Sequence, residues 1–378
     1  SEMCIRDRSG SNPWYYQIDP SFGTTEDLKE LVQKAHERGM KVVLDAVYNH
    51  TGREFFAFAD ILENGEKSKY RDWYFIDGFP LKSEWGEIPN FKCFGYYGGM
   101  PKLNLKNPEV EKYITDVACY WIKECDIDGW RLDVGDEISH FFWKNFRKAV
   151  KAVKKDMLII GEIWHYAGDF LEGDEWDTVM NYPFYLNLID LLADEKITVS
   201  QFVQNLGYLK GRLHKNCYPL MWNLIDSHDT ARFLHLCNDN KKKQHLAAAF
   251  QLLLPGMPMI YYGDEYAMPG ANDPDCRRGM YWDEEYQDKE MYEWYKRLIQ
   301  VRKSHACIVE GELAGSVTED EEGTVVLIRK NGEETIAMIF NCSSSAKKFN
   351  EYTQKYNLLT ENTFDGNVEG FDAAVIVL

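Results

Sequence analysis

Three carboxylate side chains follow apolar runs of this sequence, and their type and placement could perform acid–base chemistry. The carboxylates are Asp133, Glu162 and Asp229, and the runs that precede them are 127–132, 157–161 and 220–226. Apolar runs of this length are typical of parallel strands that are buried on both faces. Because the carboxyl ends of the strands of a barrel meet at one face, we expect the three carboxylates to share a pocket.

A shared pocket would give these carboxylates different tasks, because close like charges leave a proton on one carboxyl while another stays ionised. Arg131 lies one pleat away from Asp133 on the same strand face, so it should keep Asp133 charged and nucleophilic. Glu162 lies two residues before Trp164 and is the better candidate for the general acid. A pair of carboxyls about 5–5.5 Å apart supports double displacement at a glycosidic carbon with retention of configuration.

The third carboxylate, Asp229, would bind substrate hydroxyls more tightly as the sugar ring flattens in the transition state. His50 and His228 are hydrogen-bond donors, in neutral or cationic form, that suit the same ring. The sequence therefore predicts a site for sugar chemistry rather than a set of unrelated charges.

Each of these residues also has a structural interpretation. A carboxylate after a barrel strand can cap the next helix, and an Arg–Asp pair at a strand end can be a buried ion pair. Three carboxylates and two histidines could instead hold a divalent ion. Arg131 within the cluster would oppose a cation, so we expect no metal there, although Asn49 could ligate a peripheral calcium ion.

Composition narrows the class of partner. The chain has 378 residues, of which 45% are hydrophobic and 14% aromatic; this suits a barrel-sized core and aromatic surfaces for sugar rings. The net charge is -18 with no basic cluster, which argues against nucleic acid and anionic membranes, and no run is long enough to span a bilayer. The 9 Cys are scattered without metal-ligand spacing, which favours free thiols in a reducing, cytoplasmic compartment.

Strand-like and helical runs alternate through most of the chain, which predicts a parallel sheet with right-handed crossovers. The expected strands are 41–45, 127–133, 157–162, 177–181, 220–226 and 257–262. The expected helices include 26–38, 107–124, 137–154, 199–213, 244–254 and 289–303. Polar groups concentrate at the carboxyl ends of the strands, as on the active face of a TIM barrel, and a closed barrel needs eight strands. We therefore expect an α/β fold, a (β/α)8 TIM barrel that lacks its first two strands.

Three segments fall outside this alternation. Residues 51–105 have no sustained period and are expected to form an excursion domain after the third barrel strand. In 305–378, short strand-like runs separated by turns predict a C-terminal antiparallel β domain. The barrel would then comprise 9–50 and 106–304, and SEMCIRDR at 1–8 resembles a translated sequencing adapter more than a natural terminus.

Five short motifs, in a fixed order over most of the chain, carry a resemblance to a known family. They are DAVYNH at 45–50, GWRLDVGDE at 129–137, GEIWH at 161–165, IDSHDT at 225–230 and GMPMIYYGDE at 256–265. The chain thereby resembles the α-amylase superfamily of glycoside hydrolases. Within it, the chain is similar to the neopullulanase, cyclomaltodextrinase and maltogenic amylase group, through GEIWH together with MPKLN at 100–104, GDEWDTVMNYPF at 173–184 and NDPDCRR at 272–278.

The resemblance implies roles for individual residues. Asp133 corresponds to the nucleophile, Glu162 to the acid/base and Asp229 to the transition-state stabiliser. The residues that it implies for sugar binding are His50, Arg131, Trp164, His228 and Arg278. The activity that it implies is retaining hydrolysis of α-1,4 bonds, with α-1,6 bonds as an option, in cyclodextrins, maltooligosaccharides, pullulan or starch, together with transfer to acceptor sugars. The expected partner is an α-glucan, no cofactor is required, and calcium is an option.

The sequence also departs from this family. It has no counterpart of the first two barrel strands, or of the N-terminal β domain through which the subgroup forms dimers and binds calcium. We expect the full-length protein to be a homodimer. Two other functions stay open: an α-glucosidase or oligo-1,6-glucosidase of the same superfamily, and a catalytically inactive glucan-binding protein, against which the three intact carboxylates speak.

Overall fold

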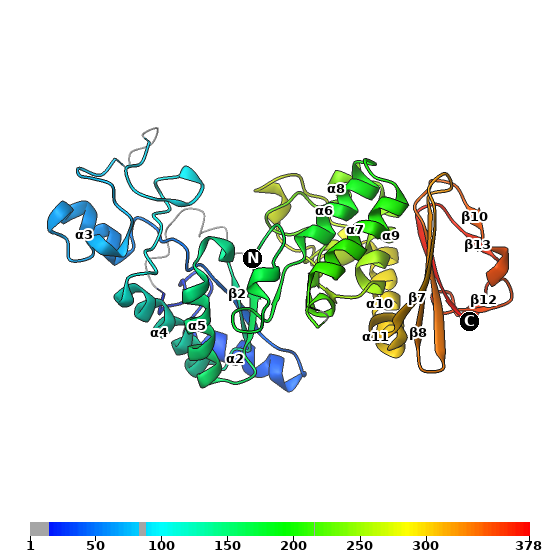
Figure 1. Cartoon of the computed structure of the whole chain (residues 1–378), viewed down its shortest axis with the longest axis horizontal. Helices are drawn as coiled ribbons and strands as arrows, with labels where there is room; N and C mark the ends of the chain where they lie inside the picture. The colour runs from blue at the N-terminus through cyan, green and yellow to red at the C-terminus, as the bar shows by residue number, and fades with distance from the viewer. Residues whose placement is uncertain (1–14, 83–87, 215) are drawn as a thin grey trace. The chain divides into compact units, whose positions relative to one another are not determined.

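The structure is a computed structural model that describes residues 15–82, 88–214 and 216–378. The segment SEMCIRDR at 1–8 lies outside the described residues. The backbone divides into two compact units, which are Ser1–Ile163 with Ala167–Val179, and Trp164–Tyr166 with Met180–Leu378. We call them unit 1 and unit 2 (Figure 1).

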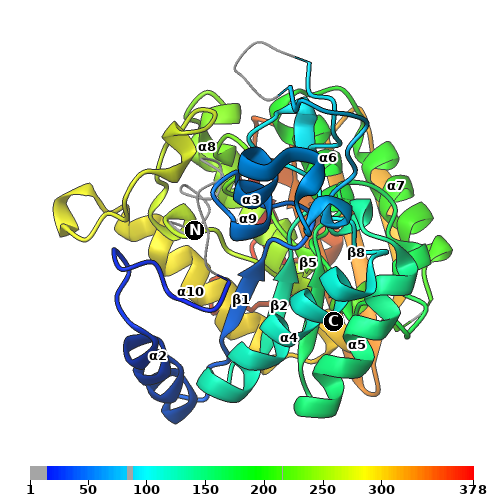
Figure 2. The ribbon, with the colours of Figure 1, turned by 90° about the vertical axis from the view of Figure 1, so that its left-hand side faces the viewer.

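Unit 1 contains a four-stranded parallel sheet with the strand order β1-β2-β3-β4. Its strands are β1 (Val43–Ala46), β2 (Gly129–Leu132), β3 (Leu158–Gly161) and β4 (Thr178–Val179). Every residue of β2 is buried, as expected for a central strand that is paired on both edges. In the ladder, Arg131 of β2 lies between Asp45 of β1 and Ile160 of β3. Figure 2 shows β1 and β2 side by side.

Three long helices belong to the same unit, and all three begin at a side-chain cap. They are α2 (Thr25–Glu37), α4 (Pro108–Cys125) and α5 (His140–Val153), and their caps are Thr24, Asn107 and Ser139. Each cap oxygen accepts a backbone N–H that the first helical turn leaves without a partner. Apolar residues at helical spacing give α4 and α5 a buried face each, and the two helices pack against each other (Figure 1).

One buried carboxylate, Asp128, ties the amino ends of β1 and β2. It accepts hydrogen bonds from the backbone N–H of Val42 at 2.9 Å and from Lys154 at 3.0 Å, and it lies 2.7 Å from Nε2 of His36. Burial alone would raise the pKa of Asp128, but these donors lower it well below its ordinary value. Because this network lies at the opposite end of the strands from Asp133, we assign it to stability.

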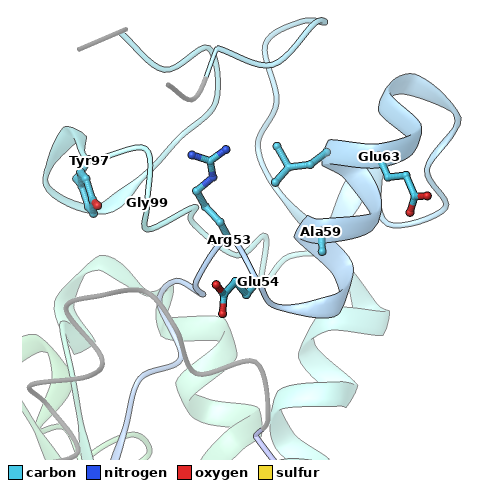
Figure 3. Close-up of a pocket in the computed structure, with 7 residues that line it drawn as sticks. Arg53, Glu54, Ala59, Glu63, Tyr97 and Gly99 are labelled. Atoms are coloured by element: carbon cyan, nitrogen blue, oxygen red, sulfur yellow. The ribbon is translucent and has the colours of Figure 1, made fainter. Parts of the chain in front are cut away.

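The segment 51–105 leaves β1 and returns to it. It contains α3 (Phe56–Asn64) and short 3-10 turns, which are Gly65–Lys67, Arg71–Trp73 and Phe94–Tyr96. Near its end, the amide of Leu103 donates to the carbonyl of Asn49 at 3.0 Å, and the amide of Thr51 donates to the carbonyl of Pro101 at 3.0 Å. An open hollow in this segment is lined by Arg53, Glu54, Ala59, Leu62, Glu63, Tyr97 and Gly99 (Figure 3).

Unit 2 is mainly helical before its C-terminal sheet. Its helices are α6 (Tyr182–Leu188), which continues as the π turn Ile189–Ala193, α7 (Val199–Arg212), α8 (Phe233–Leu236), α9 (Lys241–Leu253), α10 (Lys289–Ser304) and α11 (Cys307–Glu310). Two short strands, β5 (Trp222–Asn223) and β6 (Met257–Pro258), pair in parallel. α9 is buried on every side from Leu246 onward, and its buried Gln251 donates to the carbonyls of Asn223 and Met259.

The last part of unit 2 is an antiparallel sheet, in which Figure 1 labels β7, β8 and β12. It has six strands in the order β12-β11-β14-β9-β8-β7. The long strands are β7 (Glu312–Glu319), β8 (Thr324–Asn331), β9 (Glu334–Asn341) and β14 (Asp372–Val377), and the short ones are β11 (Tyr356–Asn357) and β12 (Asn362–Thr363). A second pair joins β10 (Lys347–Lys348) to β13 (Asn367–Val368). One apolar cluster packs between the six-stranded sheet and this pair of strands. It is formed by Val326, Ala337, Ile339, Phe349, Phe364, Val368, Ala374 and Ile376.

The six parallel strands expected from the sequence are all present, and each is shorter than expected. The difference is largest at 220–226, where only Trp222–Asn223 is paired although Leu224 and Ile225 are fully buried. Hydrophobicity reports burial, and a buried residue at a strand end need not take part in the ladder. The expected helices and the C-terminal antiparallel sheet are confirmed, whereas α3 was not expected within 51–105.

Candidate active site

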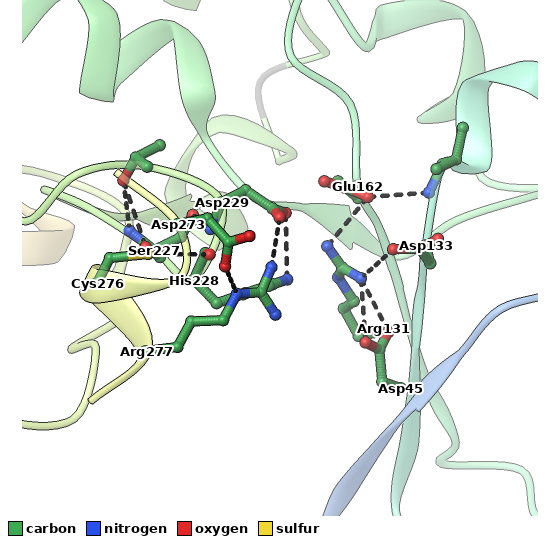
Figure 4. A network of polar contacts seen from close by, with 12 residues as sticks. Asp45, Arg131, Asp133, Glu162, Ser227, His228, Asp229, Asp273, Cys276 and Arg277 are labelled. Atoms are coloured by element: carbon green, nitrogen blue, oxygen red, sulfur yellow. Dashed lines mark hydrogen bonds and ion pairs between the residues drawn. The ribbon is translucent and has the colours of Figure 1, made fainter. Parts of the chain in front are cut away.

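Arg131 gathers three carboxylates at the carboxyl ends of β1, β2 and β3 (Figure 4). Its Nη1 lies 2.9 Å from Oδ1 of Asp45 and 2.9 Å from Oδ1 of Asp133, and its Nη2 lies 3.0 Å from Oε2 of Glu162. The strand register produces this arrangement, because Asp45 and Arg131 are direct partners while Asp133 and Glu162 immediately follow β2 and β3. The structure thus brings two of the expected catalytic carboxylates to one guanidinium.

The electrostatics of this network favour a charged Asp133. Burial alone would lower the pKa of the Arg131 guanidinium, but Asp45, Glu162 and Asp133 raise it well above its ordinary value. The guanidinium therefore stays cationic and favours the ionised form of Asp133. The side chain of Asp133 keeps 17% of its surface exposed against 10% for Arg131, so the carboxylate is the more accessible partner. A charged and accessible carboxylate is suited to nucleophilic attack.

Backbone geometry after β2 holds Glu162 from a second side. Val134 has φ 47° and ψ 43°, in the left-handed region that a β-branched residue rarely adopts. In this conformation its N–H donates to Oε2 of Glu162 at 2.9 Å. Strain of this kind persists where the surrounding structure fixes it, and here it orients the expected acid/base.

The strand β3 can carry Glu162 to this position because Gly161 has no side chain. A Cβ at Gly161 would lie 2.2 Å from the ring of Trp176, which is 1% exposed. The ring of Trp176 in turn stacks on Phe170, with 4.0 Å between the ring centroids. The close approach of strand and indole therefore requires glycine at this position.

His50 lies in the bend after β1 and is buried in unit 1. Its ring stacks on Phe94, with ring centroids 5.1 Å apart and an interplanar angle of 5°. Burial lowers the pKa of His50 to about 4. The sequence left the neutral and cationic forms open, and this environment selects the neutral ring, which donates through one nitrogen only.

In unit 2, Asp229 lies between an imidazole and a guanidinium (Figure 4). Oδ2 of Asp229 is 3.1 Å from Nε2 of His228, and Oδ1 is 3.1 Å from Nη2 of Arg277. Arg277 is buried, and its Nε is 2.7 Å from Oδ1 of Asp273. His228 and Asp229, which were expected separately to bind the sugar, are thus in contact, and Arg277 fixes the carboxylate from the other side.

The two remaining expected binding residues lie on the surface of unit 2. Trp164 stacks on Tyr182 at a centroid distance of 3.9 Å and is 39% exposed, so the indole presents surface to solvent on which a sugar can stack. The side chain of Arg278 is 42% exposed, and its Nε lies 2.7 Å from Oδ1 of Asp275.

Two charged residues of these networks are absent from the sequence-based expectation. Asp45 ends the strand 41–45 and begins the motif DAVYNH, so the rule applied to Asp133 and Glu162 would also have found it. Arg277 adjoins Arg278 in a 3-10 turn, where no period indicates which of two neighbouring arginines points inward. The three-dimensional structure shows that Arg277 is the buried arginine and that Arg278 is the exposed one.

Metal binding finds no support at the expected peripheral position. In the described part of the chain, no group of three or more His, Cys, Asp or Glu is arranged to hold a metal ion. The amide oxygen of Asn49, which the sequence suggested as a calcium ligand, lies 2.7 Å from Nζ of Lys102. An ammonium at that oxygen repels a cation, so the residues present do not fit calcium there.

Among the same described residues, no helix has both the length and the apolarity that a membrane span requires.

Comparison with known proteins gives one consistent family. The model of the alpha amylase catalytic domain matches residues 12–311. A cyclomaltodextrinase of Geobacillus thermopakistaniensis (strain MAS1) is 47% identical over 332 residues, which cover 88% of this chain and 56% of that protein. Neopullulanase 2 of Thermoactinomyces vulgaris is 42% identical over 328 residues, which cover 86% of this chain and 56% of that protein. The chain thus spans 56% of the length of both relatives.

The fold agrees with the sequence comparison. A solved structure of a cyclomaltodextrinase matches with a TM-score of 0.92 at 38% identity, covering 97% of this chain and 65% of that one. The named relatives are glycoside hydrolases of one family, and the match extends through both the barrel strands and the C-terminal sheet. The chain belongs to the alpha-amylase family and has the TIM-barrel fold of that family, followed by an antiparallel β-sheet domain.

Proposed function

We propose that this chain carries the catalytic residues of a retaining α-glucan hydrolase. The observation that carries the proposal is the Arg131 network, in which Asp133 and Glu162 come from neighbouring strands to one guanidinium. The names cyclomaltodextrinase and neopullulanase of the similar proteins support α-glucans as the substrate class.

In the proposed first step, a carboxylate oxygen of Asp133 attacks the anomeric carbon while Glu162 gives a proton to the leaving glycosidic oxygen. The glycosidic bond breaks, and a glycosyl ester forms on Asp133. In the second step, Glu162 takes a proton from water, the resulting hydroxide attacks the anomeric carbon, and Asp133 is released. When the hydroxyl of an acceptor sugar replaces water, the same step transfers the glycosyl group.

The other expected residues bind the sugar in this proposal. Asp229, fixed by Arg277, would bind ring hydroxyls more tightly in the transition state, and His228 would donate to the same ring. Neutral His50 would act as a further donor. Two residues would act beyond the cleaved bond: Trp164 as a stacking surface on the leaving-group side, and Arg278 by contacting a more distant glucosyl unit.

The proposal also concerns the architecture and the oligomeric state of the full-length protein. We infer two further barrel strands before β1, an excursion domain at 51–105 and a homodimer, as in the subgroup that the sequence resembles. The proposed chemistry requires no cofactor. All eight described cysteines are free thiols, which supports a reducing, cytoplasmic compartment.

The test is the Asp133→Asn variant of the full-length protein, assayed on cyclodextrin and maltooligosaccharides. Loss of the nucleophile should lower kcat by about 10⁴-fold or more. Proton NMR of the first product should show the α-anomer, because two displacements restore the configuration. A substrate panel that includes pullulan and isomaltose distinguishes an α-1,4-acting enzyme from an oligo-1,6-glucosidase.

A matched control is Asp156→Asn, which removes the same charge at an exposed turn before β3. It should retain the activity of the unmodified protein. Unchanged turnover in Asp133→Asn, or release of the β-anomer, would contradict the proposed mechanism. Binding of cyclodextrin without turnover by the unmodified protein would instead identify an inactive glucan-binding protein.

A further inference from the structure

We propose that the ammonium of Lys102 joins three segments of unit 1, at a position where the surrounding oxygens are of the kinds that bind a divalent ion. Nζ of Lys102 lies 2.7 Å from Oδ1 of Asn49, 2.7 Å from Oε2 of Glu137 and 3.1 Å from the carbonyl oxygen of Glu137. An ammonium has three N–H donors and no acceptor, and here three oxygens surround it. Its hydrogen-bonding capacity is therefore matched by its surroundings.

The three segments that meet at Lys102 are distant in the sequence. Asn49 belongs to the bend after β1, Glu137 ends the short turn Gly135–Glu137 after β2, and Lys102 lies near the end of 51–105. The side-chain amide of Asn49 also donates to Oε2 of Glu137 at 3.1 Å. The acceptors therefore contact each other as well as the ammonium, so a single charge holds all three segments.

Burial makes this contact worth more than an ordinary surface ion pair. Asn49 is 1% exposed and the side chain of Lys102 is 19% exposed, whereas that of Glu137 is 42% exposed. Partly desolvated charge-assisted hydrogen bonds are shorter and stronger than those at an open surface. Without Lys102, the buried amide oxygen of Asn49 would lose its cationic donor.

The chemistry of the acceptors explains why a divalent ion could take the place of Lys102. An amide oxygen, a backbone carbonyl and a carboxylate are the ligand types that calcium prefers, completed by water. In this chain the ammonium already contacts all three oxygens, and its positive charge opposes a second cation. We therefore infer that the structure here is independent of calcium because of Lys102.

The same contact helps to position a residue of the proposed site. The backbone of Lys102 pairs with that of His50 as an isolated antiparallel bridge, and Leu103 donates to the carbonyl of Asn49 at 3.0 Å. The ring of His50 stacks on Phe94, in the same segment as Lys102. Lys102 is thus a positioning residue for the bend that carries His50.

The test compares the thermal unfolding of Lys102→Ala with that of the unmodified protein, in EDTA and in millimolar calcium. In EDTA, Lys102→Ala should unfold at a Tm about 3–6 °C lower, because the partly buried ammonium and its three contacts with oxygen atoms are lost. Calcium should restore part of this loss, because the space left by the side chain is surrounded by oxygen ligands. Melting does not depend on glycoside hydrolysis, so this result is separate from the test of the proposed function.

The control is Lys106→Ala, which removes the same charge from an exposed lysine four residues further along. It should have the same Tm as the unmodified protein in both solutions. Its response to calcium measures the effect of calcium bound elsewhere in the protein. If Lys102→Ala yields no folded protein, Lys102→Gln removes the charge but keeps an amide donor, and the same comparison applies. An unchanged Tm in EDTA, or a calcium response no larger than that of Lys106→Ala, would overturn the proposal.

Discussion

At the scale of single residues, the site depends on the guanidinium of Arg131, which forms ion pairs with several carboxylates. Arg131 contacts Asp45, Asp133 and Glu162 at 2.9–3.0 Å and is itself buried. Its removal would leave three neighbouring carboxylates without their shared cation. Removing one partner from a buried ionic network is far more costly than exchanging the network for apolar groups.

We therefore expect Arg131→Ala to lower the free energy of unfolding by about 3–5 kcal/mol. Urea unfolding of the variant and of the unmodified protein measures this loss. An unchanged free energy of unfolding would contradict this account of Arg131.

The buried imidazole of His50 gives stability a defined pH dependence. Its folded-state pKa is lowered to about 4 from the ordinary histidine value of 6.5, so the unfolded chain binds the proton first as the pH falls. Stability should therefore fall between pH 6.5 and pH 4, by about 3 kcal/mol if the full shift is expressed. The His50→Gln variant should lose less stability over that window, as measured by urea midpoints.

How far the sequence predicts the site differs from residue to residue. Asp133, Glu162, His228 and Asp229 follow strands, and the contact of Arg131 with Asp133 is the one that the spacing predicts. The sequence predicted no contact between His228 and Asp229, which the structure shows. The side-chain direction of Arg277 could not be predicted, because it depends on a 3-10 turn without a periodic pattern. The contact of Lys102 with Glu137 could not be predicted either, because a whole helix and a strand separate the two residues in the sequence.

At the scale of elements, the carboxyl end of β3 depends on close packing against Trp176. We expect Gly161→Ala to destabilise the protein by about 1–3 kcal/mol, because its Cβ would overlap the indole and displace the strand end. The activity should fall with it, since Glu162 is the next residue. Differential scanning calorimetry and kcat measure the two effects.

A matched control is Gly207→Ala in α7, where no atom lies within 4 Å of an added Cβ. Alanine is the better helix former by about 1 kcal/mol, so this variant should be slightly stabilised. The same substitution is thus expected to lower stability at position 161 and to raise it at position 207. Equal effects at both would show that packing against Trp176 does not restrict Gly161.

Elements were more predictable than their ends. The helix α4 combines a strong apolar period with the polar cap Asn107, and its expected bounds of 107–124 lie within one residue of those found. The helix α5 has the same kind of period, but its expected start at 137 lies three residues before its start after the cap Ser139. The strand β5 has no comparable end signal, because the apolar run continues through Leu224 and Ile225 into a buried bend. The segment 51–105 lacks a period and yields α3 only through tertiary packing, in which Phe58 and Ile61 are buried.

At the scale of the whole molecule, the eight described cysteines are free thiols, and four of them are buried. Burial raises the pKa of Cys237 to about 12 and that of Cys342 to about 12. Because the thiolate is the reactive form, these thiols should react with Ellman's reagent only on denaturation. Guanidinium chloride should release all 9 cysteines. Rapid modification of the full number in the native protein would contradict the observed burial.

The left-handed conformation of Val134 has a consequence for the evolution of this protein in the laboratory. A β-branched residue at this backbone position costs about 1–2 kcal/mol relative to one that tolerates it. A library randomised at position 134 and selected only for heat resistance should therefore enrich glycine or asparagine. Selection for turnover alone would instead act on how firmly the amide of residue 134 holds Glu162, so the two selections need not converge on the same residue.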